Sequence, residues 1–129
     1  MRLRGFMALS LPEWDWQAHD CCRWVDRWVQ ARGHASPIAA LGLVYDSERS
    51  ALRRITEGGG LLPLWTAGMS LVGVPSVDVA KAGDVAVIHR PTVDGLDQAM
   101  AICTGKRWVS LGLRGLIYGP AKPLRVWRP

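Results

Sequence analysis

The sequence is short of cysteine and contains no long apolar segment. Its three cysteines, Cys21, Cys22 and Cys103, are an odd number, and the side chains of adjacent cysteines diverge too far to bond readily. A disulfide framework is therefore excluded, which is typical of proteins made in a reducing compartment. No apolar run approaches the roughly 18–20 residues of a membrane-spanning helix. We expect a soluble protein with no membrane span and no signal peptide.

Clusters of charge of one sign are also missing. The chain carries 16 lysines and arginines against 11 aspartates and glutamates, a net charge of +5. The excess lies in residues 65–129 and is spread singly. A nucleic-acid groove needs basic residues gathered on one face, and the periodicity shows no arginine stripe. We therefore expect no nucleic-acid partner.

Helical patterns occupy the first half of the chain. Apolar residues recur at helical spacing over Cys21–Arg32, after Asp20, a good N-cap. A short helix is expected over 36–43 and a longer one from Ser47 to Glu57. Leu61–Gly68 fits either a helical turn or a packed loop. Residues 1–19 have no regular period and are expected to be irregular.

Strand patterns begin at Val72, where valine, isoleucine, glycine and proline become frequent. A turn is expected around Asp94-Gly95. The expected strands are Val85–Ile88, Met100–Thr104, Arg107–Leu111, Leu116–Tyr118 and Leu124–Trp127. The whole chain, at 129 residues, is long enough for a single domain with one core. Its pattern predicts an α+β fold, with N-terminal helices packed on a small antiparallel sheet that contains Val85 and Val87.

Cys21 is the candidate nucleophile. A cysteine in the first turn of a helix lies where the helix dipole stabilises a thiolate. Thiol hydrolysis also needs a histidine to share the proton and a polar group to orient that histidine. A free cysteine is otherwise often a small buried hydrophobic residue, so Cys21 alone leaves both interpretations open.

Three motifs resemble the NlpC-type cysteine peptidases, which have a papain-like fold. Asp20-Cys21-Cys22 is similar to the Asp-Cys-Ser that begins their nucleophile helix, and Gly83-Asp84-Val85 is similar to the Gly-Asp that begins a strand. Ala99–Gly105 is similar to their histidine strand, with Ala99 where the catalytic histidine belongs. The resemblance implies an NlpC-like architecture that lacks the family's histidine.

A closer resemblance is to small phage and prophage tail proteins with the same plan. Gly115-Leu116 and Val126-Trp127-Arg128 are similar to their late Gly-Leu and their terminal strand, and Asp20-Cys21 and Gly83-Asp84-Val85 are shared as well. This resemblance implies a structural or assembly role at the tail tip of the virion, after synthesis in the bacterial host cytoplasm. The implied partners are other tail proteins: hub, distal tail and tape measure. The alternative is an active cysteine hydrolase that cleaves cell-wall peptides or a tail precursor.

Another histidine could replace the missing base. His89 ends the strand Val85–Ile88 and would lie near Ala99 if that strand pairs with Met100–Thr104, so Cys21 and His89 are the candidate catalytic pair. His19 lies two residues before the cysteine. The other interpretation of His89 is an exposed residue at a strand end.

Neither a metal nor a cofactor is expected. His19, Cys21 and Cys22 are residue types that bind zinc, but the spacing is not the Cys-x-x-Cys of zinc sites. Gly58-Gly59-Gly60 lacks the strand, loop and helix order of a phosphate-binding loop and is better explained as a helix terminator.

The chain is rich in tryptophan, with seven in all. Tryptophan is enriched at the energetic centres of protein interfaces. The N-terminal segment contains Leu3, Phe6 and Leu11 without a regular period. We expect residues 1–13 to form a docking arm, ordered in part by a partner protein.

Overall fold

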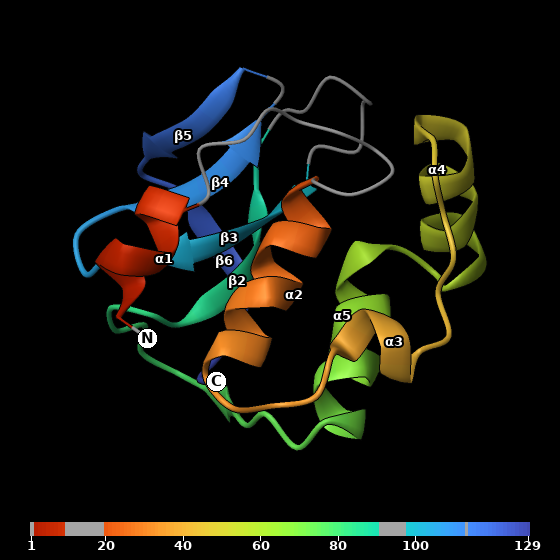
Figure 1. Ribbon diagram of the computed structural model, residues 1–129, viewed down its shortest axis with the longest axis horizontal. Coiled ribbons are helices and arrows are strands. Elements are labelled where there is room, and N and C mark those ends of the chain that lie inside the picture. Colours follow the sequence, from red (N-terminus) through yellow and green to blue (C-terminus); the bar gives the residue numbers. More distant parts are fainter. Residues whose placement is uncertain (1, 10–19, 91–97, 113) are drawn as a thin grey trace.

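The computed structural model describes residues 2–9, 20–90, 98–112 and 114–129. Within these residues helices come first and an antiparallel sheet follows, so the predicted α+β class is confirmed (Figure 1). None of the described helices is long and apolar enough to cross a membrane. The helices are α1 (Leu3–Leu9), α2 (Cys21–Ala31), α3 (Pro37–Ala40), α4 (Glu48–Glu57) and α5 (Leu61–Leu71).

The sheet of the described residues has six strands in the order β1-β6-β2-β3-β4-β5, and the pairs with a determined register are antiparallel. The short strand β1 was not predicted from the sequence. The predicted turn at Asp94-Gly95 lies outside the described residues. The strands are β1 (Ser76–Val77), β2 (Val85–His89), β3 (Gln98–Cys103), β4 (Trp108–Gly112), β5 (Gly115–Gly119) and β6 (Lys122–Trp127).

The helix starts follow from local capping chemistry. Ser36 accepts a hydrogen bond from the backbone of Ala39, and Ser47 and Ser50 form a reciprocal capping box at α4. The helix α5 has no side-chain cap and continues to Leu71, beyond the predicted end at Gly68. A Cβ at Gly68 would lie 2.9 Å from Leu41 and 3.2 Å from Pro37. The missing side chain at Gly68 therefore allows close packing of α5 on α3.

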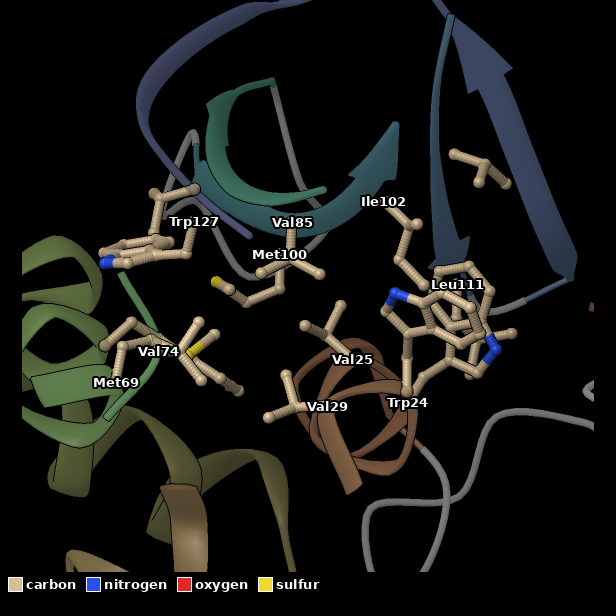
Figure 2. Close-up of a cluster of buried hydrophobic side chains, with 14 of the residues drawn as sticks. Trp24, Val25, Val29, Met69, Val74, Val85, Met100, Ile102, Leu111 and Trp127 are labelled. Carbon is tan, nitrogen blue, oxygen red and sulfur yellow. The ribbon is translucent and has the colours of Figure 1, made fainter. Parts of the chain in front are cut away.

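The main core lies between α2 and one face of the sheet (Figure 2). As predicted, Trp24, Val25 and Trp28 pack with Val85 and Val87. The indole of Trp28 also donates a 2.8 Å hydrogen bond to the carbonyl of Gly83, just before β2. The other face of the sheet has a smaller apolar cluster, made by Ala86, Ile88, Ala99, Ala101, Cys103, Trp108 and Val126.

The prediction of irregular structure over residues 1–19 is wrong for Leu3–Leu9, which forms α1. Phe6 is buried, and its ring centroid lies 5.8 Å from that of Trp24 and 5.2 Å from that of Trp28. This helix could not be predicted from the sequence because its apolar residues follow no regular period and are held by tertiary contacts. A docking role for residues 1–13 stays a prediction, but Phe6 is already used by the chain's own core.

Truncating Phe6 should detach α1 from the core. Replacing a buried phenylalanine with alanine costs about 3–5 kcal/mol, so Phe6→Ala should lower the free energy of unfolding in urea by that amount. The matched control is Gly5→Ala, because a Cβ at this exposed helical position meets nothing within 4 Å. Equal stability of Phe6→Ala and Gly5→Ala would show that α1 does not pack as described.

Candidate functional site

The candidate site is built around the first turn of α2. Asp20 is the N-cap, and its Oδ1 accepts hydrogen bonds from the backbone amides of Cys22 at 3.0 Å and Arg23 at 3.1 Å. Cys21 is the first helical residue, which confirms its predicted place at the helix start. The side chain of Cys21 is therefore presented beside the positive end of the helix dipole.

The Asp20 carboxylate is buried and fully engaged in structural contacts. Tyr45 donates its hydroxyl proton to Oδ1 at 2.9 Å, and the Arg23 guanidinium forms a 3.0 Å salt bridge to Oδ2. Arg23 also lies 4.0 Å from the centre of the Tyr45 ring and donates to the Tyr45 carbonyl. Burial raises the pKa of Asp20, and the bonds that it accepts oppose that rise. Asp20, Arg23 and Tyr45 thus fasten the start of α2 to the loop before α4.

The two adjacent cysteines have different surroundings. Cys21 is partly exposed, whereas Cys22 packs against the main core. The hydrogen bond with the Cys21 side chain and then burial raise the pKa of the Cys22 thiol well above its usual value, while a hydrogen bond from Trp65 opposes the rise. Since the thiolate is the nucleophile, Cys22 is a poor candidate and Cys21 remains the accessible one.

Sheet register decides which residues of the β2–β3 hairpin face α2. Ile88 pairs with Ala99, and both belong to the cluster on the face away from α2. Met100 belongs to the α2-facing core, and strand alternation places Gln98 on that same face. His89 pairs with Gln98 and is exposed. The motif resemblance aligns Ala99 with the family's histidine, and the structure places Ala99 on the face away from α2 and Gln98 on the face toward it.

The orientation of α2 places Cys21 and His89 toward the same end of the hairpin. Trp28, near the C-terminal end of α2, binds the carbonyl of Gly83 before β2, whereas His89 ends β2. Cys21 lies about two helical turns from Trp28, in the direction away from Gly83. Within the described part of the chain no hydrogen bond joins Cys21 to His89. The other candidate base, His19, lies outside the described residues.

The Gly-Asp motif has a structural role. Asp84 is buried and accepts hydrogen bonds from Arg128 at 3.0 Å and 2.7 Å, as well as one from the backbone of Lys81. The motifs Gly83-Asp84-Val85 and Val126-Trp127-Arg128, far apart in the sequence, are thus joined by one ion pair. The salt bridge fixes the end of the chain against the start of β2.

Comparison with known families assigns the chain by sequence. Residues 4–128 match the model of DUF6950, a domain of unknown function. The chain belongs to the DUF6950 family. No curated protein and no solved structure matches it.

Several residues of this DUF6950 site could not be found from the sequence. Contacts at the first turn of α2 are made by Arg23 of the helix itself and by Tyr45 and Trp65 from other parts of the chain. None of these residues belongs to a sequence motif that points to the site. Among the described residues no group of three or more histidine, cysteine, aspartate or glutamate side chains could hold a metal ion. The site therefore consists of a partly exposed thiol, Cys21, on a helix start that is held by structural contacts.

The register can be tested with two histidine substitutions. Ala99→His places a large polar ring in the buried cluster opposite α2, so we expect a loss of roughly 2–4 kcal/mol in the free energy of unfolding. The matched control, Gln98→His, changes a half-buried residue at the strand end and should be nearly neutral. Urea unfolding measures both. Greater destabilisation by Gln98→His would contradict the assigned faces.

Proposed function

We propose that this protein is a structural or assembly component of a phage tail tip, built on an NlpC-like scaffold without peptidase activity. The observation that carries the proposal is that the candidate catalytic centre has a cysteine but no histidine on the part of β3 that faces α2. Cys21 begins α2, but glutamine stands at the α2-facing position of β3. An amide has no basic lone pair that takes a proton at neutral pH. A scaffold of this kind can be retained for shape and contacts rather than for thiol chemistry.

The resemblance to small tail proteins supports the same role. The motifs that carry it, Asp20-Cys21 and Gly83-Asp84 with Trp127-Arg128, form a helix cap and an ion pair in this chain. Both contacts stabilise the fold and require no reaction. The proposed partners are tail proteins of the hub, distal tail and tape-measure classes, and the proposed location is the virion tail.

Co-purification tests the tail role. The tagged protein should co-elute on size-exclusion chromatography with a hub, distal tail or tape-measure protein encoded beside it, and should be present in purified tails. Cys21→Ser should assemble as well as the wild type, since the thiol has no chemical role in this proposal. Normal infectious tails from cells that lack the protein would contradict it.

The alternative, a cysteine hydrolase, is favoured by one observation: Cys21 and His89 lie toward the same end of the fold. Thiol labelling separates the two functions. In a Cys22→Ser/Cys103→Ser background, iodoacetamide should label Cys21 slowly at neutral pH, because among the described residues no histidine is hydrogen-bonded to this thiol. In the wild type, Cys22 should react only at strongly alkaline pH, since its raised pKa keeps it protonated below that range.

The same measurement identifies an active enzyme. Rapid labelling of Cys21 at neutral pH that disappears in His89→Ala or His19→Ala would show a thiolate activated by histidine. Cleavage of peptidoglycan stem peptides by the purified protein would then confirm the hydrolase.

A further inference from the structure

Two neighbouring hollows border α1. One, of about 410 Å³, is lined by Arg2, Arg32, Lys81 and Arg128 above the indole of Trp28. The other, of about 590 Å³, is lined by Leu3, Met7, Leu116 and Tyr118, with Arg4 and Arg107 at its sides. Leu3 and Ala82 line both hollows. We call these two adjacent hollows together the α1 groove.

The α1 groove carries an excess of positive charge. Six basic side chains line it, and among the lining residues that the structure describes Asp84 is the only acidic one. Asp84 is already neutralised by its two bonds from Arg128. Within the described part of the lining no other acidic side chain balances the remaining five cations, so the groove favours an anionic partner.

Two of the guanidinium groups are held in place by aromatic rings. Arg32 lies 5.5 Å from the centre of the Trp28 ring, and Arg107 lies 5.1 Å from that of Tyr118. Contacts of this kind restrict the side chain while leaving its N–H groups able to donate. Ordered guanidinium groups lose less entropy when they bind a carboxylate.

The apolar part of the groove favours a peptide over a nucleic acid as the partner. Leu3, Met7 and Leu116 offer places for aliphatic side chains beside the cations. A nucleic-acid backbone presents phosphates and sugars and would leave these apolar surfaces unused. We propose that the α1 groove binds an acidic peptide segment with interspersed apolar residues, supplied by a partner protein. This inference deepens the proposed tail role, since it states the chemistry of the contacting partner.

Direct binding tests the inference with the full-length protein. The probe is a fluorescein-labelled peptide that alternates glutamate and leucine, measured by fluorescence anisotropy. Arg4→Glu/Arg107→Glu reverses two exposed charges of the groove and should weaken binding about tenfold or more. The matched control, Arg49→Glu/Arg53→Glu, makes the same change on α4, which lies on the far side of the fold from α1 (Figure 1), and should leave binding nearly unchanged.

Three outcomes would overturn the inference. Equal losses in the groove and control variants would show diffuse attraction between opposite charges. Equal binding of a peptide that alternates glutamate and serine would show that the apolar residues of the groove do not contribute to binding. Tighter binding of a single-stranded oligonucleotide that is lost in Arg4→Glu/Arg107→Glu would assign the groove to nucleic acid.

Co-expression with tail proteins distinguishes failure of this inference from failure of the proposed function. If the wild type and the groove variant both co-elute with a tail protein, the tail role stands and the groove is not its contact site. If the wild type binds none of the tail proteins, the tail role fails, while the anisotropy measurements still decide whether the groove binds acidic peptides.

Discussion

One face of α2 is almost completely buried on the sheet, with Trp24, Val25, Trp28 and Val29 at 0–2 % exposure. Each such side chain contributes about 1.5–3 kcal/mol when it is removed from water. The face fixes the rotation of α2 about its axis, so it also fixes where the cysteines at its start point. Burial of this face also costs free energy, because the Trp24 indole N–H is buried without a hydrogen-bond acceptor among the described residues. Phe6 closes the same core from α1.

Three buried aspartates connect segments that are distant in the sequence. Asp20 binds Tyr45, Asp84 binds Arg128, and Asp26 accepts hydrogen bonds from the Ser36 hydroxyl and the Ile38 amide at the start of α3. A buried carboxylate is stable only when its lone pairs are satisfied. In this fold the carboxylates of Asp20, Asp26 and Asp84 therefore have structural roles. They hold α2, α3 and the C-terminal segment in place.

Local patterns determined how much could be predicted from the sequence. The start of α2, with Asp20 as its cap, and the core strand Val85–Ile88 follow from capping and apolar periodicity, and the structure confirms both. The helix α1 and the extension of α5 depend on tertiary packing at Phe6 and Gly68, which no local rule contains. For the same reason Tyr45 and Trp65, which reach the site from other elements, could not be predicted from the sequence.

The motif resemblance aligns the family's histidine with Ala99, and in a strand a shift of one residue changes the face of the sheet. Ala99 belongs with Ile88 on the side away from α2, whereas Gln98 and His89 form the pair that ends the α2-facing side of the hairpin. On the α2-facing side, this end of β3 therefore carries a glutamine. A glutamine can orient a neighbour through hydrogen bonds, but it cannot take up a proton at neutral pH. On this side of the hairpin, among the described residues, proton transfer would depend on the exposed imidazole of His89 alone.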